Sequence, residues 1–250
     1  QGIIRHLASQ ETFDLSAAWA SLHNPLQGQA ITSQVTLTDQ VIELFKKSDG
    51  IIDFSQPQAT YALLEQALKH KKPLVIGTTG LGQQQLDLLK QVSKDMPVVY
   101  ARNTSIGITV MQAVVRQLTL ALGEEFDIEL TETHHRHKVD APSGTCLMLA
   151  EAAAEARGVS LDKVARYERQ GHVGPRLKGE IGFSVRRGGQ SPGEHTVSFL
   201  SDEESIEITH HSFSRDLFVK GALKAARWVV SQTAGLYNMV DVLGMAHLKK

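Results

Sequence analysis

The sequence is short of cysteine, of net charge and of long apolar runs. Cys146 is the single cysteine in 250 residues, so no disulfide can form within the chain and we expect a reducing compartment. Lys and Arg number 26 against 27 Asp and Glu, which excludes the strongly basic balance of a non-specific nucleic-acid binder. No run of about 18 apolar residues and no signal peptide is visible, so the sequence predicts a cytoplasmic protein without a membrane or nucleic-acid partner.

The rest of the composition is that of a folded protein. Hydrophobic residues make up 42% and charged residues 21%, with 20 Gly and 7 Pro, all close to the average of soluble globular chains. A chain of 250 residues is long enough to bury a core and corresponds to one large domain or two modest ones.

Strands and helices are expected to alternate in the first part of the chain. Apolar runs at 50–54, 73–76 and 97–101 have the length of buried strands. A helical pattern follows each of the first two runs, from Pro57 and from Leu86. This alternation predicts βαβ units and a parallel sheet.

Small polar residues and glycines follow each of these runs. They form the segments Asp53–Ser55, Gly77–Thr79 and Ala101–Thr104. Ligands of open parallel sheets bind at the carboxyl ends of the strands, where these three segments are expected to meet. Because each segment alone is also typical of a plain turn between strand and helix, the hypothesis of a ligand site depends on all three together.

The pattern changes after a long apolar helix predicted at 106–122. Later segments alternate apolar and polar residues with a period of two, as strands with one buried face do: 127–132, 180–185, 195–199 and 205–209. No helical pattern separates the last three, which predicts hairpin or mixed connections. A final helix is predicted at 217–236. The sequence therefore divides into a βαβ part up to Thr104, a sheet-rich part from Ser105 to Ser214, and a helix that docks on one of them.

The segment from Glu132 to Thr145 joins two features that bind anions. His134–Lys138 are five consecutive residues that are or can become cationic, and they create a local field that attracts anions. Pro142 then precedes a helix predicted at 146–157, so Ser143–Thr145 would offer backbone N–H groups at a helix N-terminus. Either feature alone is typical of a solvated loop or an ordinary cap. Together they predict a site for a small acidic molecule.

A metal site is the lesser alternative for the histidines. In an extended chain His135 and His137 face one way and His134 the other, which is a poor arrangement for shared ligation. Three histidines further along the chain could complete a site in space: His195, His210 and His211. The spacing favours no metal.

Acid–base chemistry fits these residue types better than nucleophilic catalysis. Cys146 falls within a helical pattern, and Ser143 lacks the motif of a nucleophile elbow. Histidine and lysine can pass a proton near neutral pH. In an extended chain His134 and Lys138 would lie about 13 Å apart, at about 3.3 Å per residue, so their joint action requires a turn between them.

These residues resemble one family. The segment Glu132-x-His134-His135-Arg136-His137-Lys138-x-Asp140-x-Pro142-Ser143-Gly144-Thr145 is similar to the signature of bacterial dihydrodipicolinate reductase, also called 4-hydroxy-tetrahydrodipicolinate reductase, of lysine and diaminopimelate biosynthesis. Further segments resemble the family in the same order along nearly the whole chain: Ile52–Ser55, Val75–Gly80, Ala101–Gly107, Gly193–His195, Ser214–Arg215 with Phe218, and Gly235–Leu243.

The resemblance implies an oxidoreductase that reduces 4-hydroxy-tetrahydrodipicolinate to tetrahydrodipicolinate by hydride transfer from NADH or NADPH. It also implies an α/β fold. A Rossmann-like parallel-sheet domain of residues 1–104 and 215–250 would bind the dinucleotide, and an α+β mixed-sheet domain of residues 105–214 would bind the substrate and form a homotetramer. The substrate is a small dicarboxylate, which explains a basic strip beside a helix N-terminus.

The resemblance also assigns roles to single residues. It implies that His134 is the proton donor and acceptor and that Lys138 is a second proton donor. The residues implied to bind the substrate are His135, Ser143, Gly144 and Thr145. Those implied to bind the cofactor are Gly2, Gly77, Thr78, Thr79, Ala101, Arg102, Asn103, Thr104, Arg215 and Phe218. No metal is implied.

The sequence departs from the family at its start and after its first strand. Family members begin with a strand and a glycine-rich phosphate loop, of which Gly2 resembles only the last glycine, so we expect residues to be missing before Gln1. Ala20 and Ser21 follow a strand predicted at 15–19, where an acidic residue would select NADH or an arginine NADPH, so neither cofactor is selected. A binding protein without activity and an oxidoreductase for a different small acid are the alternatives.

Overall fold

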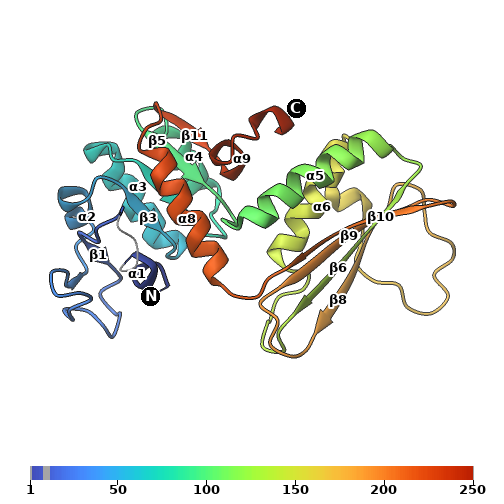
Figure 1. The fold of residues 1–250 in the computed structure, drawn as a ribbon, viewed down its shortest axis with the longest axis horizontal. Coiled ribbons are helices and arrows are strands. Elements are labelled where there is room, and N and C mark those ends of the chain that lie inside the picture. The colour runs from blue at the N-terminus through green and yellow to red at the C-terminus, as the bar shows by residue number, and fades with distance from the viewer. Residues whose placement is uncertain (1, 8–11, 250) are drawn as a thin grey trace. The chain divides into compact units, whose positions relative to one another are not determined.

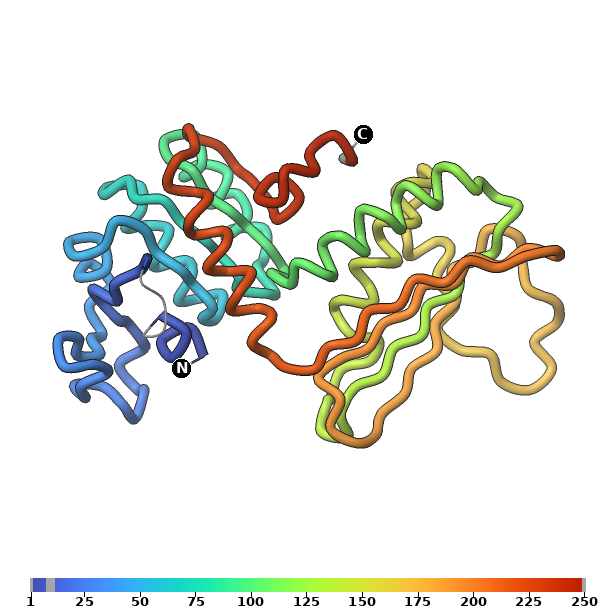
Figure 2. Tube along the Cα trace, viewed as in Figure 1, coloured from blue at the N-terminus to red at the C-terminus, as the bar shows by residue number. Residues whose placement is uncertain are grey.

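The computed structural model describes residues 2–7 and 12–249, which form two compact units. The first unit contains the chain up to Ser105 together with Asp216–Ala246, and the second contains Ile106–Arg215 with the last residues of the chain. Figure 2 shows how the C-terminal segment, in orange and red, returns to the unit formed by the blue and green N-terminal segments.

The first unit is built on a parallel sheet of four strands in the order β11-β5-β4-β3 (Figure 1). Its strands are β3 (Ile51–Asp53), β4 (Leu74–Ile76), β5 (Pro97–Tyr100) and β11 (Gly235–Tyr237). The intervening helices are α3 (Pro57–His70) and α4 (Gln83–Val92), and Pro57 is the first helical residue of α3, as predicted. The predicted parallel sheet is confirmed.

Both faces of this sheet are covered, which explains why its strands are apolar without alternation. Leu74 and Ile76 of β4 pack with α3 and α4, in a cluster that includes Leu63 and Leu89. Val75, which points to the other face, packs with α8 (Asp216–Val229), and α8 crosses that face of the sheet (Figure 1). The short helix α9 (Met239–Val242) completes this second layer.

The helix predicted at 217–236 was wrong in its last part. Helix α8 ends at Val229, and Leu236 lies in β11, opposite Val98 of β5. A short apolar run such as Gly235–Tyr237 cannot be assigned to a helix or a strand from its periodicity alone. Its pairing with the edge of the sheet determines its conformation.

The described residues before β3 form short helices and strands that join the first unit, where Leu44 and Phe45 pack into the same core cluster as Leu63. Helix α1 (Gly2–Leu7) contacts α8, where Gly2 lies next to Val219. The strand predicted at 15–19 is shorter than expected: β1 (Ala18–Trp19) pairs in parallel with β2 (Leu37–Thr38), and neither is hydrogen-bonded to the four-stranded sheet in the described ranges. Helix α2 (Ile42–Lys47) leads into β3.

The second unit is built on a mixed sheet of five strands in the order β10-β9-β6-β8-β7. The strands are β6 (Asp127–His134), β7 (Ala165–Arg166), β8 (Ile181–Arg187), β9 (Glu194–Leu200) and β10 (Ser205–His211). Strand β6 runs parallel to β8 and antiparallel to β9, and β9 and β10 form a hairpin. The predicted mixed sheet is therefore confirmed.

One face of this sheet carries the core of the second unit. Helices α5 (Ile106–Leu122) and α6 (Gly144–Ala156) lie side by side on it, followed by the short α7 (Leu161–Val164) (Figure 1). Ile128 and Leu130 of β6 pack there with Phe199 of β9. The same face continues at Glu132 and His134, because side chains two apart on a strand point the same way.

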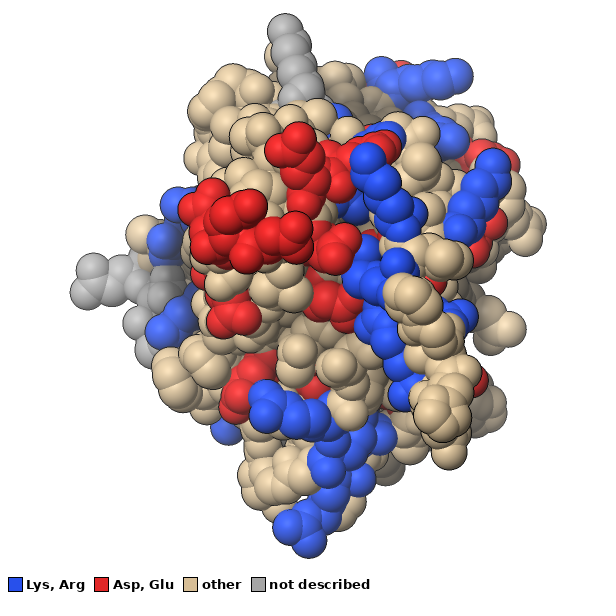
Figure 3. Space-filling view, turned by 90° about the vertical axis from the view of Figure 1, so that its right-hand side faces the viewer, with Lys and Arg blue, Asp and Glu red and all other residues tan. Residues whose placement is uncertain are grey.

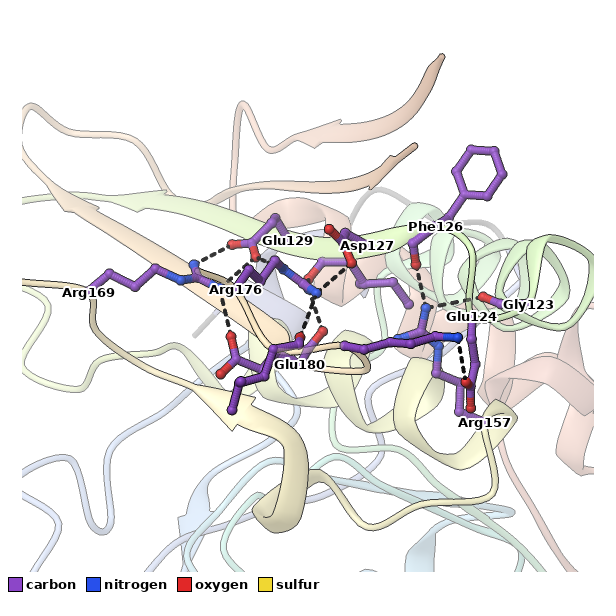
Figure 4. A network of polar contacts seen from close by, with 12 residues as sticks. Gly123, Glu124, Phe126, Asp127, Glu129, Arg157, Arg169, Arg176 and Glu180 are labelled. Atoms are coloured by element: carbon purple, nitrogen blue, oxygen red, sulfur yellow. Dashed lines mark hydrogen bonds and ion pairs between the residues drawn. The ribbon is translucent and has the colours of Figure 1, made fainter. Parts of the chain in front are cut away.

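A network of ion pairs attaches the 167–180 segment to the start of β6 (Figure 4). Arg176 donates to Asp127 Oδ1 at 2.6 Å and to Glu129 Oε1 at 3.1 Å, and also to the carbonyl groups of Ile128 and Glu180. Arg169 makes a second, two-pronged contact with Glu129 at 2.9 and 3.0 Å.

The small net charge of the chain conceals separated charges. Figure 3 shows acidic side chains gathered in one area of a face and a band of Lys and Arg side chains beside it.

None of the described helices is both long and apolar enough to span a membrane. The chain closes with the 3₁₀ helix η1 (Ala246–Lys249).

Candidate active site

The end of β6 in the second unit holds a buried carboxylate and a buried imidazole. Glu132 is fully buried and His134 is 7% exposed. Arg187 donates from both terminal nitrogens to the two oxygens of Glu132, at 2.8 Å each, and the His134 Nδ1 lies 2.5 Å from Oε2. A carboxylate can be buried without a large cost when it is paired and hydrogen-bonded in this way.

The site changes the proton affinity of both groups. Burial alone would raise the pKa of Glu132, but hydrogen bonds from Arg187, His134 and a backbone N–H outweigh burial, so the pKa is lowered and the carboxylate stays ionised. Burial lowers the pKa of His134 and outweighs the opposing effect of Glu132, with smaller lowering effects from Lys138 and Arg187. His134 without a ligand is therefore a neutral imidazole near pH 7.

The chain turns between His134 and Lys138, as the joint action of these two side chains requires. The Lys138 N–H donates to the His135 carbonyl at 3.1 Å. The Lys138 amine then binds both oxygens of Asp140, at 2.7 and 2.9 Å, which lowers the pKa of Asp140. The charge of Lys138 also contributes to the lowered pKa of His134, after burial and the opposing effect of Glu132.

Ser143 is the N-cap of α6, and its amide group is already used. Its Oγ accepts a hydrogen bond from Cys146 N–H at 3.1 Å, whereas its own N–H donates to Glu132 Oε1 at 2.9 Å. The prediction of a free N–H group was therefore wrong at Ser143, because a buried carboxylate from β6 takes it. Gly144 and Thr145 form the start of the helix.

His195 is a buried member of the site whose role was not predicted. It is 5% exposed, its Nε2 lies 3.1 Å from Ser143 Oγ, and its ring meets that of His134 edge to face at 5.2 Å between centroids. Burial, followed by the effect of His134, lowers the pKa of His195 to about 3, so the ring is neutral. Strand pairing places Glu132 opposite His195, and His195 opposite His210.

Three side chains of the site, Glu132, Arg187 and His195, were not among the predicted site residues. Two of them had a signal in the sequence. Glu132 continues the inward positions 128 and 130 of its strand, and His195 precedes the inward positions 197 and 199. A polar residue at an inward position needs a partner, so the interrupted apolar alternation marks both. Arg187 carried no such signal.

The alternatives of metal binding and cysteine chemistry find no support in this unit. Across residues 2–7 and 12–249, no three His, Cys, Asp or Glu side chains are placed to share a metal ion. His211 instead pairs with Glu194, 3.7 Å away. Burial raises the pKa of the Cys146 thiol to about 12, which leaves it unreactive at neutral pH.

In the first unit, the segment after β4 is fixed by a buried carboxylate. Asp53 Oδ2 accepts hydrogen bonds from the hydroxyls of Thr60 and Thr78, at 2.5 and 3.1 Å, and Oδ1 accepts one from the Ser55 N–H. Gly77 lies under the ring of Phe54, where a Cβ would stand 2.4 Å from the nearest ring carbon. The loop therefore has a defined conformation and requires glycine.

The segment after β5 is held by α8. Thr104 Oγ1 donates to the Phe218 carbonyl at 2.8 Å, and a Cβ on Gly221 would stand 1.7 Å from the Thr104 carbonyl oxygen. The Asn103 side chain accepts from the Ser105 N–H at 2.8 Å. Ala101 is buried, whereas three of the predicted cofactor residues are exposed: Thr79, Arg102 and Arg215.

Comparison with known proteins identifies relatives along nearly the whole chain. The family described as dihydrodipicolinate reductase, N-terminus, matches residues 1–104, and that described as dihydrodipicolinate reductase, C-terminus, matches residues 107–243. A 4-hydroxy-tetrahydrodipicolinate reductase from a Nitratiruptor species is 50% identical over 210 residues, which are 84% of this chain and 82% of that protein. One from Campylobacter concisus is 45% identical over 245 residues, or 98% and 94%.

Solved structures share the fold. A dipicolinate-bound dihydrodipicolinate reductase from Paenisporosarcina sp. TG-14 has a TM-score of 0.77 at 21% identity, over 96% of this chain and 93% of that one. A probable dehydrogenase from Thermotoga maritima has a TM-score of 0.60 at 11% identity, over 99% and 90%. With both family matches and with relatives at 45% and 50% identity, the chain belongs to the dihydrodipicolinate reductase family.

Proposed function

We propose that this protein reduces 4-hydroxy-tetrahydrodipicolinate to tetrahydrodipicolinate, with NADH or NADPH as the hydride donor, in lysine biosynthesis through diaminopimelate. The observation that carries the proposal is the buried imidazole of His134 beside the N-terminus of α6. This arrangement combines a group that exchanges protons with a group that binds carboxylates, as the reduction of a dicarboxylate requires. The family membership agrees with it.

Residues 1–104 and 215–250 are proposed to be the dinucleotide-binding domain, which matches the first unit except that Ser105 also lies in that unit, and Arg215 and the last residues of the chain lie in the second. This domain fits a dinucleotide because the loop after β4 has no side chain at Gly77 and is held by Asp53 through Thr78, at the carboxyl end of a parallel sheet. The residues proposed to hold the cofactor are Gly2, Gly77, Thr78, Thr79, Ala101, Arg102, Asn103, Thr104, Arg215 and Phe218. When bound, the reduced nicotinamide supplies a hydride to a ring carbon of the substrate.

Residues 105–214, which lie in the second unit except for Ser105, are proposed to bind the substrate. Gly144 and Thr145, at the start of α6, would hold one carboxylate, with Ser143 and His135 nearby in the sequence. The 4-hydroxyl group would leave as water, which gives the conjugated ring that accepts the hydride, so the net reaction consumes one reduced cofactor and one proton and releases one water. The negative charge that builds up on this ring after hydride addition would be neutralised by a proton from His134, with Lys138 as a second donor. A bound dianion favours the protonated form of His134, which burial disfavours in the empty site.

The protein is proposed to use NADH and NADPH without a strong preference for either. Ala20 and Ser21 follow β1, and neither carries a carboxylate for the ribose hydroxyl of NADH or a guanidinium for the phosphate of NADPH. We expect the values of kcat/KM for NADH and NADPH to be similar. A preference of more than about tenfold, which is about 1.4 kcal/mol, would contradict this.

The protein is also proposed to be a cytoplasmic homotetramer. The family resemblance supports the tetramer, and the free thiol of Cys146 supports a reducing compartment. Light scattering coupled to gel filtration tests the first part. A homotetramer has four times the mass of the 27.4-kDa chain, and a monomeric mass would contradict it.

The activity is tested by following the absorbance of NADH or NADPH with freshly made 4-hydroxy-tetrahydrodipicolinate. The wild-type protein is expected to consume the cofactor only when the substrate is present. The double variant His134→Ala/Lys138→Ala is expected to lose turnover while its NADH affinity is unchanged. Near-normal turnover in this variant would show that these two side chains do not transfer the proton.

A further inference from the structure

Glu132 connects the proton-transfer residue with the helix proposed to bind substrate. Its side chain is fully buried and accepts hydrogen bonds from several elements. Arg187 of β8 donates to both oxygens at 2.8 Å, and Ser143 N–H, at the start of α6, donates to Oε1 at 2.9 Å. His134 of the same strand contacts Oε2 at 2.5 Å. One carboxylate therefore contacts β8, α6 and the proton-transfer residue.

The charge of Glu132 determines the tautomer of His134. An ionised carboxylate has no proton to give, so the Nδ1 of His134 must carry the hydrogen of their shared bond. The bidentate contact with Arg187 keeps Glu132 ionised and restricts its orientation. Nε2 is then the atom of His134 that takes up or gives the proton in the reaction.

The surroundings of Nε2 are consistent with this assignment. A Cβ built on Gly193 would lie 2.9 Å from the Nε2 of His134, so a side chain at this position would crowd Nε2, and glycine avoids that contact. The other charged or titratable groups that face His134 are Arg187 on β8, His195 on β9 and Lys138 in the next loop. His195 is neutral, and its Nε2 contacts Ser143 Oγ.

The same carboxylate fixes the start of α6. Through the Ser143 N–H it holds the N-cap residue, whose Oγ in turn accepts the Cys146 N–H. Gly144 and Thr145 follow directly as the first residues of the helix. A shift of Glu132 would thus move both His134 and the helix N-terminus.

We propose that Glu132 is a positioning residue of this active site, which holds His134 with Nε2 available for proton transfer and fixes the first turn of α6 relative to it. The inference rests on the proposed function, in which His134 transfers a proton and Gly144 and Thr145 bind a substrate carboxylate. Glu132 touches neither substrate nor cofactor in this proposal. It acts through His134 and Ser143.

The test is the pH profile of kcat for Glu132→Gln, which keeps the size of the side chain and removes its charge. We expect kcat to fall about tenfold or more, because general acid–base catalysis contributes about 10²–10⁴-fold. The pH limb that reports protonated His134 is expected to shift to lower pH, since Glu132 raises the pKa of His134. The Kd of NADH is expected to stay the same.

Glu129→Gln is the matched control. Glu129 lies on the same strand and pairs with two arginines, Arg169 and Arg176, but it points to the opposite face of the sheet from Glu132. Its loss is expected to leave both kcat and the pH limb at their wild-type values. If Glu132→Gln alone does not fold because Arg187 loses its countercharge, the double variant Glu132→Gln/Arg187→Met removes both charges and should show the same loss and shift.

A second measurement does not depend on turnover. In protein labelled with ¹⁵N-histidine, NMR at alkaline pH should show the His134 proton on Nδ1, with the signal assigned by its loss in His134→Gln. The proposal is overturned by an Nε2–H tautomer in the wild type, or by an unchanged kcat and pH profile in folded Glu132→Gln. Failure of the proposed function would instead appear as absence of turnover in the wild type, with the tautomer still readable.

Discussion

Gly193 lies against the ring of His134 so closely that a Cβ built on Gly193 would stand 2.9 Å from Nε2 and 3.4 Å from the ring of His195. The φ angle of Gly193 is +150°, which L side chains rarely adopt. We predict that Gly193→Ala loses roughly 10- to 100-fold in kcat, because a displacement of about 1 Å in a catalytic group can cost about 10²-fold. The measurement is steady-state reduction at saturating cofactor.

Gly189→Ala is the control for this prediction. Gly189 lies in the same connection between β8 and β9 and has a φ of +59°, but no atom lies within 4 Å of the position that a Cβ would take there. Its substitution adds backbone strain of about 1–2 kcal/mol without contact with His134. An equal loss of kcat in both variants would assign the effect to the loop and not to the imidazole.

The fold of the second unit could be predicted because its strands alternate. The side chains of residues 127–132 alternate between the inner and outer faces of the sheet. Because of this alternation, Glu132 and His134 lie on the inner face. The contact with Arg187 could not be predicted. It depends on the parallel register that sets His134 opposite Arg187 on a strand far along the chain, and nothing in the local sequence determines that register.

The sequence could likewise predict only those features of the His134 site that depend on neighbouring residues in the chain. Local residue types predict a helix N-cap near Ser143, and in the structure Ser143 is the N-cap of α6. The partner of the Ser143 N–H is Glu132, a side chain on another element, so the sequence alone could not exclude a free N–H there. Likewise, the position of Leu236 in β11 depends on the exposed edge of β5 and not on the residues beside it.

His195 is predicted to make stability depend on pH. Its folded-state pKa is about 3, mainly because it is buried and then because His134 is near, whereas an unfolded histidine titrates near 6.5. Between these values the unfolded chain binds a proton that the folded chain does not. The free energy of unfolding therefore falls as the pH falls from about 6.5 toward 3, by up to about 1.4 kcal/mol per pH unit from this residue.

His195→Gln is expected to weaken this dependence, with part of it kept because the pKa values of His134 and His210 are also lowered, mainly by burial. Urea unfolding at pH 7.5 and pH 5.5 measures the difference. His172→Gln, at an exposed histidine, serves as the control and should behave like the wild type. Parallel losses of stability in His195→Gln and the wild type would contradict the prediction.

Asp53 is predicted to contribute to cofactor affinity without touching the cofactor. In Asp53→Ala the hydroxyls of Thr60 and Thr78 lose their acceptor in a buried place, at a cost of about 1–3 kcal/mol. The loop that contains Thr78 is then no longer held, and the Kd of NADH should rise about tenfold, as measured by the fluorescence of bound NADH.

Asp95→Ala is the corresponding control in the first unit. Asp95 is exposed, pairs with Lys71 at 3.3 Å, and precedes β5, at the opposite end of the strand from Ala101–Thr104. Its removal should leave the Kd of NADH unchanged. An unaltered Kd in folded Asp53→Ala would show that the loop keeps its conformation without the carboxylate.

Arg176 is predicted to stabilise the 167–180 segment and not the chemistry (Figure 4). Its guanidinium contacts two carboxylates and three carbonyl groups while only 19% of the side chain is exposed, so Arg176→Ala should lower the free energy of unfolding by about 1–3 kcal/mol. Hydrogen exchange of the segment's amides should become faster, whereas kcat should stay within about twofold, because no residue of the His134 site contacts this network.

Lys178→Ala provides the comparison within the same segment. Lys178 is 74% exposed and forms an ion pair with Glu124 at 3.6 Å, so its loss should change the free energy of unfolding by no more than about 0.5 kcal/mol. Hydrogen exchange at the segment should then match the wild type. Equal rates of hydrogen exchange in the 167–180 segment of Arg176→Ala and Lys178→Ala would contradict the prediction. Packing, such as the stacked rings of Tyr167 and Phe183, 5.0 Å apart, would then stabilise the segment in place of the ion pairs.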